Sequence, residues 1–174
     1  TLLDRQNHHV FQPLLYQVAT AGLSAPDIAA PLRHILRRQK NVDVRMATVT
    51  GIDAGAKRIV LHDGTSLDFD SLLLASGATH AYFGNDHWAA HAPGLKTLDD
   101  ALDLRRKLLL AFERAEAATD PAEREAWLHF AIVGGGPTGG RADSFGGGAD
   151  SFDAAAGGIS VTAPVGGSVA DNSG

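Results

Sequence analysis

The clearest pattern in the chain is a long amphipathic segment in its second half. Within 98–118, Leu102, Leu109 and Phe112 recur at helical spacing, while the positions between them carry many charged side chains. One apolar stripe with a charged outer face is typical of a helix that packs on a core. The pattern therefore predicts a helix over 98–118, followed by a second helical stretch at 121–127.

A helical pattern also begins at Pro26. The apolar positions that follow each other at helical spacing are Ile28, Leu32, Ile35 and Leu36. Ser24 stands in the N-cap position and Asp27 in the first turn, and both favour a helix start here. Between 10 and 20 the apolar residues are interrupted by Pro13, which predicts a broken segment rather than one long helix.

Residues 42–77 follow the two-residue period of strands instead. Apolar and polar residues alternate there, and the Asp63-Gly64 pair predicts a tight turn, so the simplest interpretation is a small antiparallel β-meander. Two further runs, 71–75 and 130–133, are apolar without alternation, as expected of strands buried on both faces of a parallel sheet. A short apolar run at 1–4 predicts another strand. Strands of this kind beside helices predict an α/β fold.

The composition changes after Gly139. Residues 140–174 contain no Leu, Lys or Glu, and nine of these 35 residues are Gly. Such a segment offers too little apolar surface to offset the conformational entropy that is lost on ordering. We predict that it is disordered.

Composition also excludes several classes of function. A formal net charge of -5 argues against nucleic acid as the main partner, because phosphate backbones require a basic surface. The chain has no cysteine, so it holds neither a disulfide, a thiolate metal site nor a redox-active Cys pair. No apolar run reaches the roughly 18 to 20 residues that cross a bilayer. The eight histidines show no helical pair with a carboxylate between them, which favours surface histidines over a metal site.

The strongest chemical signal is a glycine pattern directly after the apolar run 130–133. Gly134, Gly136 and Gly139 match the order Gly-x-Gly-x-x-Gly. In a dinucleotide fold the first glycine permits a tight turn, the second lets the backbone approach a pyrophosphate, and the third lets a helix pack on the strand. A glycine-rich linker is the alternative, since the chain holds 20 glycines. The preceding strand favours cofactor binding.

The residues after this pattern do not predict the helix that should follow it. Gly140-Arg141-Ala142-Asp143 and further glycines stand where a helix N-terminus would donate N–H groups to the phosphates. One hypothesis is a change of reading frame, because codons for 140–143 can be chosen so that dropping their first base reads Val-Glu-Leu. Sequencing the encoding DNA tests it: an alternative frame without an amphipathic helix after Gly139 rejects the hypothesis.

Asp4, at the end of the first predicted strand, is a second candidate. An acid in this position can accept the ribose hydroxyls of a dinucleotide that is held by a glycine-rich turn roughly 20 residues upstream. A lone Asp after a strand is more often a turn residue, and the glycine-rich turn would have to precede Thr1. Both interpretations stay open on these residues alone.

Three blocks of sequence resemble type II NADH:quinone oxidoreductases. They are Asp4-Arg5-x-Asn7-His8-His9-x-Phe11-Gln12-Pro13-Leu14-Leu15-Tyr16-Gln17-Val18-Ala19-Thr20-Ala21-Gly22-Leu23, Ala75-Ser76-Gly77-Ala78-Thr79-His80-x-Tyr82-Phe83-Gly84 and Pro93-Gly94-Leu95-Lys96-Thr97-Leu98. The resemblance runs from about residue 1 to 139. It is specific, because the first block is long and is not a general property of dinucleotide folds.

The resemblance implies a flavoprotein in which electrons pass from NADH through FAD to a membrane quinone. The cofactor-binding residues that it implies are Asp4, Arg5, Pro13, Leu14, Val49, Ala75, Ser76 and Gly77 for FAD, and Gly134, Gly136, Pro137, Thr138 and Gly139 for NADH. It implies no catalytic side chain in this chain, because the flavin itself carries the hydride chemistry.

The resemblance also implies a role for each part of the FAD site. Asp4 would hold the adenosine ribose, the segment from Pro13 to Leu15 would lie along the flavin, and Val49 would offer backbone contacts to the adenine. Ala75-Ser76-Gly77, which is usually Ala-Thr-Gly in the family, would form a second turn where a small side chain lets the backbone approach the cofactor.

The chain departs from the family at both ends. The first glycine motif of the family would precede Thr1, and Arg141 occupies the position of a family Glu near the flavin. The quinone pocket and the C-terminal amphipathic membrane anchor have no counterpart here. We therefore expect 1–118 to be a partial FAD-binding domain, 119–139 the start of an NADH-binding domain, and 140–174 a divergent tail.

The expected fold is α/β, an incomplete FAD/NAD(P)-binding Rossmann-like domain with an antiparallel β-meander. The parent protein would be cytoplasmic and peripheral to the inner face of the cell membrane, with a homodimer as one open assembly. This chain alone would be inactive as an enzyme and would hold FAD weakly if at all. Two alternatives stay open. One is another two-dinucleotide flavoprotein, such as a ferredoxin or sulfide-oxidising reductase, and the other is a non-catalytic fragment.

Overall fold

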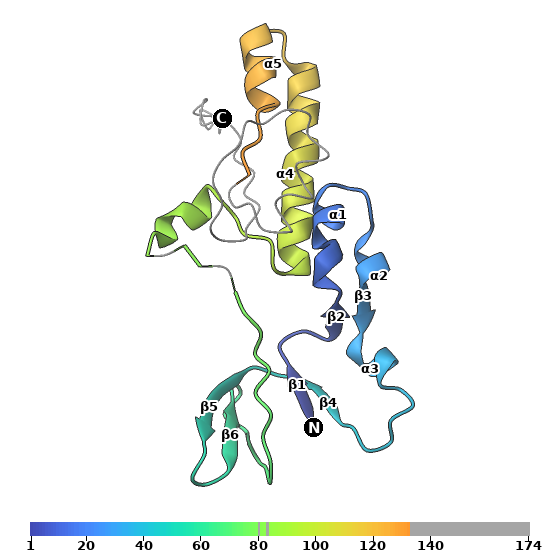
Figure 1. Cartoon of the computed structure of the whole chain (residues 1–174), viewed down its shortest axis with the longest axis vertical. Helices are drawn as coiled ribbons and strands as arrows, with labels where there is room; N and C mark the ends of the chain where they lie inside the picture. The colour runs from blue at the N-terminus through green and yellow to red at the C-terminus, as the bar shows by residue number, and fades with distance from the viewer. Residues whose placement is uncertain (80, 83, 133–174) are drawn as a thin grey trace, which may run out of the picture. The chain divides into compact units, whose positions relative to one another are not determined.

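The computed structural model describes residues 1–79, 81–82 and 84–132. The chain divides into a unit of strands and short helices, Thr1–Phe11 with Pro26–Ala78, and a helical unit, Gln12–Ala25 with the described residues from Thr79 onward (Figure 1). These are called unit 1 and unit 2 below. The predicted glycine motif at 134–139 and the predicted disordered tail at 140–174 lie outside the described residues.

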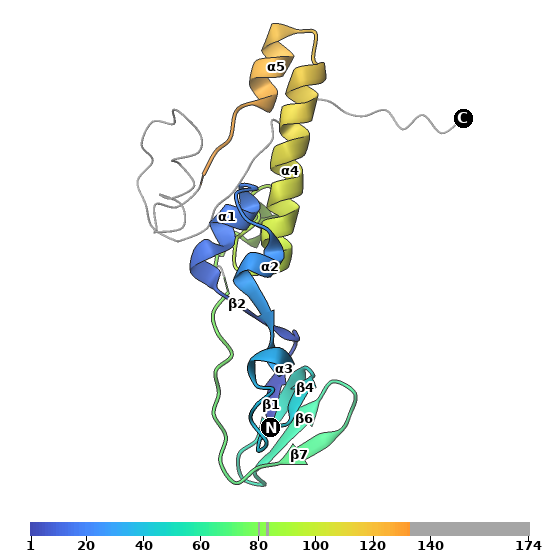
Figure 2. The same ribbon diagram turned by 90° about the vertical axis from the view of Figure 1, so that its right-hand side faces the viewer.

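The predicted antiparallel meander is confirmed in unit 1. Strands β5 (Val49–Asp53), β6 (Arg58–Leu61) and β7 (Ser66–Asp68) form one sheet in the order β5-β6-β7, and each neighbouring pair is antiparallel (Figure 2). Ile59 and Leu61 are buried while Val60 between them is exposed, as the two-residue period requires.

The turn that joins β6 to β7 lies where the sequence predicts it. Gly64 has a φ of +82°, a conformation that favours glycine, and the carboxylate of Asp63 accepts a 2.9 Å hydrogen bond from the N–H of Thr65. These two features fix the chain reversal between the strands.

The first predicted strand is also confirmed, as β1 (Leu2–Asp4), and its partner is β4 (Val44–Met46). The two strands are parallel, with Leu2 opposite Val44 and Asp4 opposite Met46. The alternation of 42–46 predicts that this segment belongs to the meander, and that part of the prediction is wrong. A parallel pair requires a long connection, and the sequence period alone cannot show such a distant partner.

The single helix predicted from Pro26 is wrong. The segment forms α2 (Ala25–Ile28), then β3 (Ala29–Pro31), then α3 (Leu32–Ile35). Pro31 explains the break, because a proline inside a helix lacks an N–H and clashes with the preceding turn.

Strand β3 pairs instead with β2 (His8–Val10), which the sequence pattern did not reveal. The strands are antiparallel, with His8 opposite Pro31. Backbone bonds close the ladder at both ends: Phe11 N donates to Ile28 O and Leu32 N donates to Asn7 O, each at 2.8 Å. These bonds hold the strand conformation of a segment whose spacing reads as helical.

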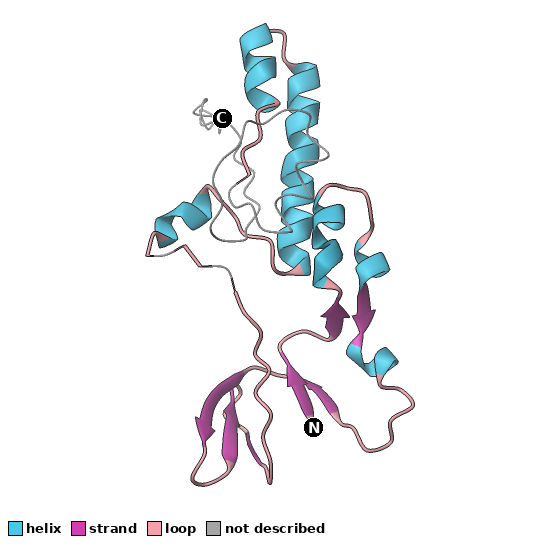
Figure 3. Cartoon of the chain, viewed as in Figure 1, coloured by secondary structure: helices cyan, strands magenta, loops and turns pink. Residues whose placement is uncertain are grey.

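The long helix of unit 2 is confirmed as α4 (Leu98–Ala117) (Figure 3). Thr97 and Asp100 form a reciprocal capping box at its start, which satisfies two of the N–H groups left free at a helix N-terminus. The break at Pro13 is confirmed too, because a 3₁₀ turn, η1 (Gln12–Leu14), precedes the short helix α1 (Leu15–Ala19).

The core of unit 2 lies between α1 and α4. The most deeply buried side chains of these helices are Leu15, Val18, Ala101 and Leu104, each at most 2% exposed.

Unit 2 also contains α5 (Pro121–Trp127), as predicted, and a 3₁₀ segment, η2 (Asp86–Ala90). Among the described residues no helix combines the length and apolarity that a membrane crossing requires.

The two apolar runs predicted as buried strands are not strands where the structure describes them. Residues 71–75 have no regular structure, and Leu73 is 89% exposed. The described part of the second run, 130–132, has no strand either, and Val133 lies outside the described residues. A strand requires a hydrogen-bonded neighbour, and within the described chain no segment pairs with either run.

Candidate functional site

Asp4 lies at the carboxyl end of β1, and its backbone and side chain have separate partners. Its backbone carbonyl accepts a 2.8 Å hydrogen bond from the N–H of Ala47, and its Oδ1 accepts one of 2.9 Å from the N–H of Gln6. The side chain is exposed. Within the described residues Oδ2 has no hydrogen-bond partner, so this oxygen can accept from a ligand.

Val49, the second candidate, begins β5 two residues after Ala47. Because Ala47 donates to Asp4, the start of β5 is held close to the end of β1. Val49 is 39% exposed. Open α/β sheets bind ligands outside the carboxyl ends of their strands, and Asp4 lies at such an end.

The third candidate segment, Ala75-Ser76-Gly77, is exposed and lies in the same unit. Gly77 has a φ of +73°, and a Cβ placed on it would have no atom within 4 Å. The open space beside this backbone fits a turn that a cofactor approaches closely. Among the described contacts, no hydrogen bond joins this turn to Asp4 or Val49.

The remaining candidates are elsewhere. Arg5 follows Asp4 and is exposed, while Pro13 and Leu14 belong to η1 in unit 2. The five residues expected to bind NADH, Gly134, Gly136, Pro137, Thr138 and Gly139, lie outside the described residues. The structure thus brings together Asp4, Arg5 and the start of β5.

Sequence reasoning missed the two backbone N–H groups that anchor Asp4. Gln6 N–H is two residues on, and the pattern Asp-x-Gln carries the signal, because Asp side chains often accept from the N–H two residues later. No local signal exists for Ala47, because its contact with Asp4 depends on the parallel pairing of β1 with β4.

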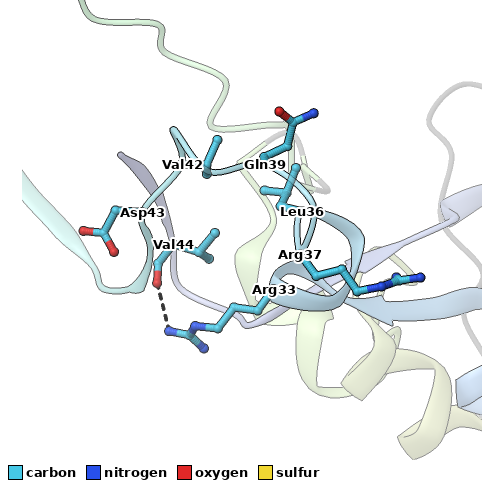
Figure 4. Close-up of a pocket in the computed structure, with 7 residues that line it drawn as sticks. All are labelled: Arg33, Leu36, Arg37, Gln39, Val42, Asp43 and Val44. Atoms are coloured by element: carbon cyan, nitrogen blue, oxygen red, sulfur yellow. Dashed lines mark hydrogen bonds between the residues drawn. The ribbon is translucent and has the colours of Figure 1, made fainter.

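A shallow pocket of about 290 Å³ lies beside α3, also in unit 1 (Figure 4). Its lining residues are Arg33, Leu36, Arg37, Gln39, Val42, Asp43 and Val44. Both arginines are held by the backbone: Arg33 donates to Val44 O at 2.9 Å and Arg37 donates to His34 O at 2.8 Å.

The charges around this pocket do not converge on its interior. The two arginine side chains extend to opposite sides (Figure 4). Asp43 is paired with Arg45 at 2.6 Å. These charges therefore serve the local fold. In the described residues no three His, Asp or Glu side chains gather in a way that could hold a metal ion.

Comparison with known proteins assigns this chain to a family. Residues 1–142 match the pyridine nucleotide-disulphide oxidoreductase family, and the chain belongs to that family. More particularly, the chain is 55% identical over 142 residues to the type II NADH:quinone oxidoreductase NdhA of Mycobacterium tuberculosis, a match that covers 80% of this chain and 30% of that protein. The type II NADH:quinone oxidoreductase Ndh of the same organism is 50% identical over 141 residues, covering 79% and 30%.

A solved structure agrees with the sequence relatives. NDH2 of Plasmodium falciparum, in complex with NADH, is 30% identical and superposes with a TM-score of 0.72 over 81% of this chain and 30% of that one. The resemblance to type II NADH:quinone oxidoreductases and the expected Rossmann-type fold are thereby confirmed. The chain spans about 30% of the length of these relatives.

Proposed function

We propose that the chain forms part of the FAD site of a flavoprotein that transfers electrons from NADH to a quinone. The observation that carries the proposal is the exposed Asp4 carboxylate at the carboxyl end of β1, in a chain 55% identical to a type II NADH:quinone oxidoreductase. No thiol chemistry is available, since the sequence has no cysteine. Bound FAD would supply the two-electron chemistry that such a reaction requires.

The residues of unit 1 fit the adenosine half of FAD. Oδ2 of Asp4 would accept from a ribose hydroxyl, and the hydrogen bond from Gln6 N–H to Oδ1 supports this role because it orients the carboxylate. The backbone at Val49 would contact the adenine. Arg5, next to Asp4, carries a positive charge that suits an anionic dinucleotide.

The resemblance assigns roles in cofactor binding to the other candidate residues as well. Ala75, Ser76 and Gly77 would let the backbone approach FAD, and the open space at Gly77 supports this role. Pro13 and Leu14 would lie along the flavin. NADH would be held by Gly134, Gly136, Pro137, Thr138 and Gly139, a proposal that rests on their spacing in the sequence.

The domain limits belong to the same proposal. Residues 1–118 would belong to the FAD-binding domain and 119–139 would begin the NADH-binding domain, with 140–174 as a divergent tail. A quinone acceptor is a lipid-soluble molecule, so the parent protein would associate peripherally with the inner face of the cell membrane. We include a homodimer in the proposal as its assembly.

Flavin content is the direct test. The chain is purified, titrated with FAD, and followed by flavin fluorescence and by absorbance near 450 nm, roughly the flavin band. We expect weak binding of FAD by this chain and no electron transfer by the chain alone. In the full-length parent, NADH should bleach the bound flavin and a soluble quinone should restore its colour. A folded chain, checked by circular dichroism, that binds no FAD would overturn the proposal. Flavin that NADH reduces but quinone does not reoxidise would point to another acceptor.

A further inference from the structure

We infer that Met46 forms an apolar wall for the adenine ring of FAD, next to the ribose contact of Asp4. The inference rests on the proposed FAD site and adds to it a side chain that the sequence motifs do not include. Met46 would determine how tightly the adenosine end is held, and it would do so without touching the flavin.

The pairing of β1 with β4 places Met46 beside Asp4. These residues are opposite each other in the parallel register, and opposite residues of neighbouring strands direct their side chains to the same face of a sheet. Both residues end their strands. Met46 therefore lies at the carboxyl edge of the sheet, on the same face as the carboxylate that is proposed to hold the ribose.

Met46 is the most exposed apolar residue in the strands of unit 1. Its side chain is 63% exposed, whereas the other exposed apolar residues in the strands of unit 1, Leu2, Val49, Ile52 and Val60, range from 37% to 44%. Single exposed apolar residues are common on protein surfaces. This one stands out because it faces the same side as the proposed ligand contact.

The chemistry of the side chain suits the base. Adenine is bonded directly to the ribose, so a ribose held by Asp4 brings the ring close to the neighbouring strand end. A thioether makes favourable contacts with aromatic rings, and the unbranched methionine chain adapts to the shape of the ring. Burying Met46 and one face of adenine together would remove apolar surface of both from water.

The backbone around Met46 is already fixed. The next residue, Ala47, donates its N–H to Asp4 O at 2.8 Å, and His62 N donates to Thr48 O at 2.8 Å. The backbone thus holds Met46 and Asp4 at a fixed separation before FAD binds. This lowers the entropy that is lost on binding. Only the methionine side chain itself needs to become ordered.

The test uses the fact that Met46 is the single methionine of the chain. The chain is treated with dilute hydrogen peroxide, and conversion of Met46 to its sulfoxide is followed by mass spectrometry of the peptide that contains it. Saturating FAD or ADP is expected to slow this oxidation, because both carry adenine. FMN, which lacks the adenosine half, should leave the rate unchanged.

Substitutions test the same contact by affinity. Met46→Ala should weaken FAD binding about tenfold, while Met46→Leu retains most of the affinity because it keeps an apolar wall. Ile52→Ala is the matched control: this side chain is 44% exposed in β5 of the same unit and should leave FAD affinity unchanged.

The outcomes separate the two proposals. If FAD binds but does not protect Met46 from oxidation, and Met46→Ala leaves FAD affinity unchanged, the proposed contact between Met46 and adenine is wrong. The proposed FAD site is then still supported. If the unmodified, folded chain binds no FAD, the proposed function is wrong, and so is the proposed contact between Met46 and adenine.

Discussion

The backbone carbonyl of Asp4 accepts a 2.8 Å hydrogen bond from the N–H of Ala47, while the side chain of the same residue stays exposed. The anchor of Asp4 in the sheet is therefore made by main-chain atoms, and Oδ2 of the carboxylate can accept from a ligand while Oδ1 accepts from Gln6 N–H. Substitution of the side chain can remove a ligand contact with little effect on the fold.

Asp4→Asn tests this separation. The amide oxygen can still accept from Gln6 N–H, so we expect stability within about 0.5 kcal/mol of the parent. FAD affinity should fall roughly 10- to 100-fold, because a hydrogen bond to a charged acceptor contributes about 1.5 to 3 kcal/mol. Fluorescence titration with FAD measures the affinity. Asp70→Asn, at another exposed acid of unit 1, is the control and should bind FAD as the parent does.

Gly77→Ala and Gly64→Ala form a matched pair. Both glycines have positive φ, +73° and +82°, and neither would bring a Cβ within 4 Å of another atom. Each substitution should therefore cost about 1 to 2 kcal/mol of backbone strain, measured by urea unfolding. Only Gly77→Ala should also weaken FAD binding. Equal FAD affinity in the two variants would remove Gly77 from the proposed site.

The fold could be predicted from the sequence where the signals are local. Helix α4 has an N-cap residue, Thr97, and apolar residues at helical spacing. The meander has a glycine, Gly64, at the turn between two of its strands. The pairings β1 with β4 and β2 with β3 have no such signal, because they join segments far apart in the chain. Residues 26–36 satisfy helical spacing, yet a strand forms there because Pro31 disfavours the helix and His8–Val10 offers a partner.

The candidate site shows the same division. Asp4 could be found from the sequence because it ends a strand and stands in a long family block. Met46 could not, because its relevance arises only from its register with Asp4. The apolarity of the run 71–75 predicts a buried strand, but a strand also requires backbone partners, which apolarity does not reveal. Leu73, at 89% exposure, shows that apolar composition without a partner does not bury a segment.

The meander should lose stability in acid through Asp68. Arg58 donates a 2.7 Å hydrogen bond to Asp68 across β6 and β7, and this bond and the positive charge lower the pKa of Asp68 below its usual 3.8. A carboxyl whose folded pKa is depressed stabilises the fold above its unfolded pKa, and that contribution disappears as the pH falls through the folded value.

The expected signature is an additional loss of stability between about pH 5 and 2 that Asp68→Asn and Arg58→Gln both reduce. The pair is exposed, with side chains 50% and 70% accessible, so the effect should be small and should shrink in high salt. The double variant should differ little from either single variant, since both remove the same contact. Additive single effects in urea unfolding at pH 7, where the full contribution of the pair is present, would contradict this account.

In unit 2, Arg124 should stabilise the junction between α4 and α5. Its Nε donates to Ala115 O at 3.1 Å and its NH2 group donates to Ala118 O at 3.3 Å. Ala115 is in the last turn of α4, where carbonyl groups lack partners within the helix. Arg124→Ala should lower the free energy of unfolding by about 1 to 2 kcal/mol, because each such bond contributes about 1 kcal/mol.

Arg106→Ala is the control for the loss of a helical arginine. Its ion pair with Asp103 is long, at 3.8 Å, and both side chains are about 70% exposed, so little stability should be lost. Helical circular dichroism during urea unfolding measures both variants, since the longest helix of the described chain is in this unit. Equal losses in the two variants would mean that charge, rather than capping by Arg124, stabilises the junction. FAD affinity should be unchanged in both, because neither arginine belongs to the proposed cofactor site.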